Sequence, residues 1–128
     1  MKKLYALLIL MMPLSVFALS NAEVRNSIQV GVIDSSTFPQ DLGDGVTSLT
    51  GISTSTRGIV YKYTLGVNQD ALSGLSNIMS NLYTQNLNQL CTNAVMSWYK
   101  MNDIEMSYIY YDESGNLVSL FSISAVNC

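Results

Sequence analysis

Apolar and polar residues alternate in several short runs along this chain, a pattern typical of strands that are buried on one face. Isoleucine and valine alternating with polar or small neighbours predict a first strand over 27–33. A weaker strand is expected over 46–52, followed by a turn rich in serine and threonine at 53–58. A clear alternation then predicts a strand over 59–65.

The apolar spacing changes to a helical one after residue 70, which predicts a helix over 70–91. Its asparagine-rich stretch at 81–88 has low helix propensity, so a kinked helix is the alternative to a straight one. A short second helix is expected to follow and to run through about Lys100. The apolar stripe of the long helix consists of Leu72, Leu75, Met79, Leu82, Leu87 and Leu90.

The C-terminal part predicts a hairpin, with strands over 104–111 and 117–123 and a turn at 113–116. The order of elements is therefore strands, helices, strands, with hairpins throughout. This order indicates an α+β fold, an antiparallel sheet of about five strands with two or three helices packed on one face. The side chains expected to face the helices are Tyr61, Tyr63, Tyr108, Tyr110, Phe121 and Ile123.

The N-terminus has the order of a secretory signal peptide: two lysines, an uncharged apolar run over 4–17, and small residues at Ala18, Ser20 and Ala22. The apolar run is shorter than the roughly 20 residues that span a bilayer. We expect a signal peptide over 1–20, cleaved near 18–22, and a single domain over 23–128. The mature protein is expected in the periplasm, free of the membrane.

The chain has two cysteines, Cys91 and Cys128. Two cysteines in an exported chain are expected to pair, because the compartment is oxidising. Closing a loop of about 37 residues contributes on the order of 4 kcal/mol in the chain-entropy model. The predicted disulfide joins a helix end to the end of the chain.

The formal charge of the whole chain is −3. Loss of Lys2 and Lys3 with the signal peptide changes this value to about −5. A negative chain is a poor ligand for nucleic acid or anionic membranes and suits a cationic protein partner. A negative charge that only keeps a small secreted domain soluble explains the same value, so this alternative to a cationic partner stays open.

The chain contains no histidine, which excludes Ser-His-Asp and Cys-His catalysis and a histidine-based zinc site. Asp41 and Asp44 are interpreted as turn-forming residues. Two pairs, Asp103 with Glu105 and Asp112 with Glu113, resemble a glycosidase carboxylate pair only in composition, because nothing in the sequence marks either pair as buried. We therefore expect no enzymatic activity, no metal and no cofactor.

Two surfaces are candidates for binding. The first is an aromatic-rich turn, because tryptophan and tyrosine often anchor interfaces; it comprises Trp98, Tyr99, Lys100, Met101, Asn102, Asp103 and Glu105. For Trp98 alone, a place in the core beside the disulfide is the favoured interpretation. The second is the sheet face away from the helices, which would form a homodimer, contact a partner or lie under the N-terminal segment; it comprises Val60, Ile109, Tyr111, Val118 and Leu120.

Several short motifs carry a resemblance: the strand at 58–65 with its Tyr-x-Tyr, Leu90-Cys91 at a helix end, the Tyr-x-Tyr at 108–110, and the terminal Cys128. With these motifs the chain resembles a family of small exported proteobacterial proteins, some of which are named quorum-sensing-regulated virulence factor-like. It also resembles periplasmic immunity proteins of Vibrio-type type VI secretion systems.

The second resemblance implies that the protein neutralises a lysozyme-like, peptidoglycan-degrading effector. From the negative charge and the aromatic residues, we expect the aromatic-rich turn to block the cleft of this effector. The alternative is an envelope or secretion-system accessory protein with a structural, pilotin-like role.

Overall fold

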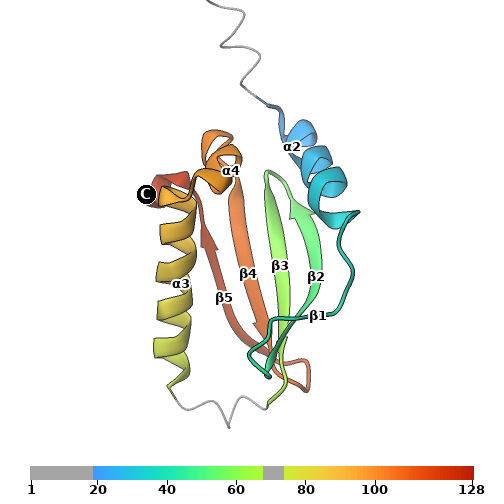
Figure 1. Cartoon of the computed structure of the whole chain (residues 1–128), viewed down its shortest axis with the longest axis vertical. Coiled ribbons are helices and arrows are strands. Elements are labelled where there is room, and N and C mark those ends of the chain that lie inside the picture. Colours follow the sequence, from blue (N-terminus) through green and yellow to red (C-terminus); the bar gives the residue numbers. More distant parts are fainter. Residues whose placement is uncertain (1–18, 68–73) are drawn as a thin grey trace, which may run out of the picture.

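The computed structural model describes residues 19–67 and 74–128, which form one five-stranded sheet with helices on one face (Figure 1). The predicted signal segment lies almost wholly outside these residues. The strands, in their order across the sheet, are β1 (Gln40–Asp41), β2 (Thr47–Ser55), β3 (Gly58–Leu65), β4 (Glu105–Tyr111) and β5 (Leu117–Ile123). The helical elements are α2 (Asn21–Ile28), η1 (Gln29–Ile33), α3 (Leu75–Thr92), η3 (Ala94–Met96), α4 (Ser97–Met101) and η4 (Ala125–Asn127). The predicted α+β class is confirmed.

The sheet contains one parallel pair, β3 with β4, in a register that runs from Gly58 opposite Glu105 to Thr64 opposite Tyr111. The other three pairs are antiparallel. The prediction of hairpins throughout is therefore wrong at this pair. The chain leaves β3 at one end of the sheet and returns through α3 and α4 to the other end, and such a crossover places the two strands in the same direction.

The strand predicted over 27–33 is wrong, because this segment is helical. Ser20 begins α2 with a capping box, in which its side chain accepts from the Glu23 amide and the Glu23 carboxylate accepts from the Ser20 amide. Val24 and Ile28 are four residues apart and both fully buried, so the helical spacing, and not the alternation that follows it, decides the local structure.

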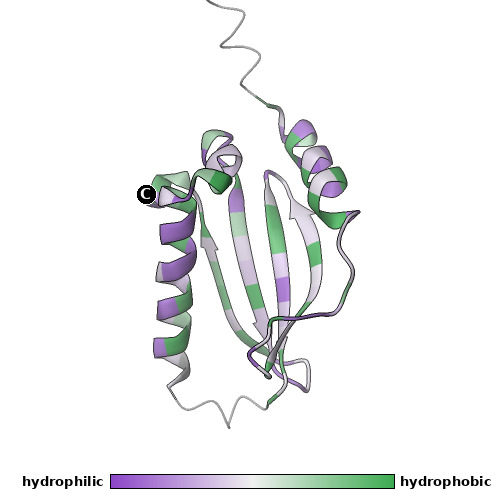
Figure 2. Cartoon of the chain, viewed as in Figure 1, coloured by the Kyte–Doolittle hydropathy of each residue, from purple (hydrophilic) through white to green (hydrophobic). Residues whose placement is uncertain are grey.

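Two further boundaries differ from the expectation. Strand β2 continues through Ser55, so the turn predicted at 53–58 is reduced to Thr56 and Arg57. Helix α3 runs without interruption over 18 residues, since the polar residues of its asparagine-rich stretch lie mainly on the exposed side. Figure 2 shows this mixed character, with hydrophilic stretches of α3 alternating with apolar ones. Residues 70–73 of the helix predicted over 70–91 lie outside the described residues.

The core lies between the inner face of the sheet and the helices. One cluster of buried side chains joins α2, α3 and the strands β3, β4 and β5. Its fully buried members are Val24, Ile28, Ile59, Leu90, Ile104, Met106 and Ile123. Among residues 19–67 and 74–128, no helix combines the length and the apolar character needed to cross a membrane.

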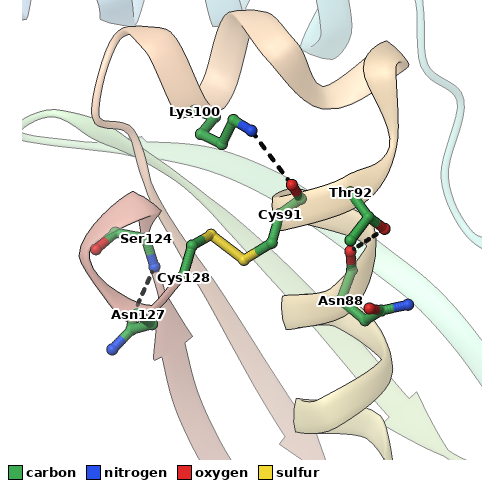
Figure 3. The surroundings of a disulfide bond; sticks show 7 residues. All are labelled: Asn88, Cys91, Thr92, Lys100, Ser124, Asn127 and Cys128. Atoms are coloured by element: carbon green, nitrogen blue, oxygen red, sulfur yellow. Dashed lines mark hydrogen bonds between the residues drawn. A yellow bond between two sulfur atoms is a disulfide. The ribbon is translucent and has the colours of Figure 1, made fainter.

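The predicted disulfide is present and joins Cys91 in the last turn of α3 to Cys128 after η4 (Figure 3). The two Cα atoms are 5.6 Å apart. Beside the bond, the Lys100 ammonium donates to the Cys91 carbonyl at 3.2 Å, and Thr92 donates to the Asn88 carbonyl. The bond thus fixes the C-terminal end of α3 to the segment that follows β5.

The pair Phe121 and Leu120 tests which face of the sheet is the core. The Phe121 ring stacks on Tyr108 at 4.9 Å and meets Tyr83 edge-on at 5.7 Å, whereas its neighbour Leu120 is 58% exposed. Phe121→Ala should lower the free energy of unfolding by about 3 kcal/mol, measured by urea denaturation. Leu120→Ala, the matched control, should cost less than about 1 kcal/mol. The opposite order would show that the faces are reversed.

Candidate functional site

An apolar groove of about 330 Å³ lies between the N-terminal half of α3 and the loop from β1 to β2. Leu65 and Tyr110 contribute to it from the sheet, at the end of the sheet far from the disulfide. The complete lining is Leu42, Asp44, Val46, Thr47, Leu65, Ile78, Met79, Leu82 and Tyr110. Since most of these side chains are apolar and several are exposed, the groove can hold an apolar ligand.

The loop side of the groove is held in place by two aspartates. Asp41 accepts from the Gly43 amide at 2.8 Å. Asp44 accepts from the Val46 and Thr47 amides at 2.9 and 2.6 Å. The interpretation of both aspartates as turn-forming residues is therefore confirmed. Hydrogen bonds from Thr47 and Val46 lower the pKa of Asp44, so its carboxylate is charged at neutral pH and contributes one negative charge to the rim.

The apolar side chains at the mouth of the groove come from both walls. Leu42 on the loop is 50% exposed, and Ile78 on α3 is 45% exposed. Ile78 and Leu82 are four residues apart on α3 and line the same wall. Exposed apolar side chains that face each other across a hollow are typical of binding sites for apolar segments.

An array of aromatic rings covers the inner face of the sheet next to the groove. Tyr61 lies 5.3 Å from Tyr108, and Tyr63 lies 4.7 Å from Tyr110, in nearly parallel stacks across β3 and β4. Phe121 extends the array onto β5. Burial raises the pKa of all four tyrosines, to about 12 for Tyr108 and Tyr110. The rings form a rigid, neutral floor at physiological pH.

The aromatic-rich turn predicted as a partner site forms α4 and the residues after it. Trp98 and Tyr99 are partly buried against the core and meet edge to face at 5.1 Å. Asn102 is only 8% exposed and donates to the Trp98 carbonyl. Of the residues predicted to bind a partner, Met101 is 70% exposed, and the Lys100 ammonium donates a hydrogen bond to the Cys91 carbonyl. The aromatic residues of this turn thus belong largely to the fold.

The two acidic residues of that prediction, Asp103 and Glu105, are exposed and line a second hollow of about 460 Å³. Arg57 also lines it, but its guanidinium donates to the Leu19 and Asn102 carbonyls and to Asn21. No group of three or more potential metal ligands occurs in the part of the chain that the structure describes.

The second predicted surface, the outer sheet face, is present but lacks one of its members. Ile109 pairs with Leu120, and Tyr111 lies two residues along the same strand face. Val60 lies on the corresponding face of β3. Val118, however, packs against the core cluster, because the register of β4 and β5 shifts between Tyr110 and Tyr111. The remaining four residues line the face that no described helix covers.

Sequence reasoning missed the groove. Its residues are distant in sequence, from Leu42 to Tyr110, and only the parallel crossover brings them together. One signal was available: Leu42 and Val46 are apolar residues within a loop otherwise rich in glycine and aspartate.

The fold of this chain is similar to that of three solved structures. A pilotin from the Vibrio vulnificus type 2 secretion system, EpsS, is 13% identical with a TM-score of 0.59, over 84% of this chain and 96% of that chain. A Pseudomonas aeruginosa protein described as secreted is 14% identical with a TM-score of 0.65, over 87% and 97%. The type II secretion system pilotin AspS from Vibrio cholerae is 11% identical with a TM-score of 0.53, over 84% and 97%.

No protein-family model and no curated protein matches this chain. At such low identity the three structures establish a shared fold and nothing about a shared activity. The similarity covers 96–97% of each of the three neighbouring chains.

The buried tyrosines predict a loss of stability at high pH. Their folded-state pKa lies above the value of about 10 for an exposed tyrosine, so the unfolded chain releases protons that the folded chain keeps. The stabilisation is complete below about pH 10 and is lost as the pH rises towards about 12. Urea denaturation across this range should show the decline. The double variant Tyr108→Phe/Tyr110→Phe keeps the rings and should show a smaller decline of stability with pH. If its decline equals that of wild type, the buried hydroxyl groups are not the cause.

Proposed function

We propose that this protein is an exported accessory protein of a secretion system, similar in role to a pilotin, that binds a protein component of the machinery in the groove beside α3. The observation that carries the proposal is this apolar groove on a fold shared with EpsS and AspS, which are pilotins of type II secretion systems. The signal-peptide pattern at the N-terminus supports an exported, periplasmic location.

The chemistry of the groove defines the occupant that we propose. Ile78 and Leu82 form a ridge along α3, against which a second helix can pack. Asp44 stands at the rim and favours a basic side chain on the occupant. The ligand is therefore an amphipathic helical segment of the partner protein, with apolar residues in the groove and a lysine or arginine at its edge.

This role is binding without catalysis. The chain has no histidine, and the tyrosines on the groove side of the sheet have raised pKa values that keep them protonated. The groove therefore offers contact area and one fixed charge, which serve recognition.

The immunity interpretation has less support. It assigns the partner contact to the turn around Tyr99 and Asn102, but Asn102 is buried and Tyr99 packs against the core. The similar structures include two pilotins of type II secretion systems, which favours the secretion-accessory alternative over a blocker of a cell-wall hydrolase.

The test is complementation of a deletion strain of the organism that encodes the chain. Secretion of a type II substrate enzyme into the medium is measured with wild type, with Leu42→Asp/Ile78→Asp in the groove, with Leu120→Asp on the outer sheet face, and with Met101→Asp on α4, where Met101 is 70% exposed. All three substituted leucine and isoleucine side chains are 45–58% exposed, so folding should be retained and checked by circular dichroism. Groove variants should reduce secretion by about tenfold or more, and Leu120→Asp should match wild type.

The outcomes separate the surfaces. Full secretion by the folded groove variant would overturn the groove as the site. Loss of secretion with Leu120→Asp alone would place the contact on the outer face, and loss with Met101→Asp alone would place it on the α4 turn. Normal secretion in the deletion strain would overturn the secretion role itself.

A further inference from the structure

The Arg57 side chain connects three segments of the chain that are distant in sequence. Its Nη1 donates to the Leu19 carbonyl at 2.8 Å and to Asn21 Oδ1 at 3.1 Å. Its Nε and Nη2 donate to the Asn102 carbonyl at 3.0 and 2.6 Å. The turn between β2 and β3, the N-terminal segment and the end of α4 are thus held together by one planar group, a geometry that arginine provides and lysine does not.

The N-terminal segment is part of the fold from Leu19 onward. The Leu19 side chain packs against the core cluster. Ser20 and Glu23 form the capping box of α2, which satisfies amide groups that a helix start otherwise leaves without partners. Through this helix, Val24 and Ile28 reach the core with no exposed surface.

The sequence pattern leaves three positions for removal of the export signal, after Ala18, Ser20 or Ala22. A cut after Ala22 removes Leu19, Ser20 and Asn21, and with them the cap and both N-terminal acceptors of Arg57. A cut after Ser20 removes the cap and the Leu19 carbonyl, and turns Asn21 into a charged terminus. Only a cut after Ala18 keeps every one of these contacts.

We propose that the signal peptidase site of this chain is the Ala18–Leu19 bond and that the mature protein begins at Leu19. Hydrolysis of this bond adds one water, leaving a carboxylate on Ala18 and an amine on Leu19. The peptidase acts before the chain folds, so the fold does not guide the cut; it shows which product keeps its contacts. The proposal rests on the export signal and not on the groove.

The direct test is the intact mass of the full-length chain after expression and purification from the periplasm, with N-terminal sequencing. The expected mass is that of residues 19–128 with one disulfide. A mature chain that starts at Asn21 or Glu23 would overturn the proposal and leave the export signal intact. An uncut chain would overturn both.

A second test measures whether Leu19 to Ala22 contribute through Arg57. Chains beginning at Leu19 and at Glu23 are each made with Arg57→Lys and, as the matched control, Arg25→Lys. Arg25 lies on α2, and its side chain donates to the Thr56 carbonyl. We expect Arg57→Lys to lower Tm by several degrees in the longer chain and clearly less in the shorter one.

The control substitution Arg25→Lys should lower Tm by the same amount in both chains. If Arg57→Lys also lowers Tm by the same amount in both chains, the contacts with Leu19 and Asn21 do not stabilise the fold, and the structural basis of the proposal is wrong. If the chain that begins at Glu23 is as stable as the longer one, the conclusion is the same.

Discussion

The parallel pairing of β3 with β4 is the constraint on which the rest of the structure depends. Antiparallel neighbours can be joined by a short turn, but a parallel neighbour requires the chain to return along the whole length of the sheet. Here the return path carries α3 and α4. It places the apolar side of α3 over the tyrosine array and leaves the helix beside the loop from β1 to β2. The groove between α3 and that loop is therefore a consequence of the topology.

The contacts differ between the two ends of the connection from β3 to β4. At its C-terminal end, the disulfide fixes α3 to the segment after β5, and the Arg57 guanidinium fixes the end of α4 to the N-terminal segment. At the opposite end, the wall formed by Ile78 faces Leu42 across open space, with exposed apolar surface on both. Covalent and charged contacts thus stabilise one end of the molecule, while apolar surface stays exposed at the other.

Much of the fold could be predicted because its signals are local. Strand β3, the final hairpin and the disulfide follow from alternation, turn residues and cysteine count. The strand expected over 27–33 was wrong because the alternation of Ile28, Val30 and Val32 competes with a capping box at Ser20, seven residues before the alternating run begins. The parallel pair and the groove could not be predicted from one sequence, since both depend on where distant segments meet. The aromatic-rich turn illustrates the same limit: composition identified residues of interface type, but Asn102 and Trp98 stabilise the fold.

The groove and the outer sheet face differ in shape and in polarity. Ile109 and Leu120 lie on a face of regular strands, where their neighbours include polar side chains such as Ser107 and Ser122, which bond each other at 2.8 Å. Such a face offers area without a concave shape. The groove offers apolar walls from two elements, the ring of Tyr110 on the sheet side and a single charge with a defined position at Asp44. Concave apolar surface with one oriented charge discriminates between ligands in a way that a flat mixed surface does not. Selective recognition of one partner segment, the role that we propose, is thus better served by the groove.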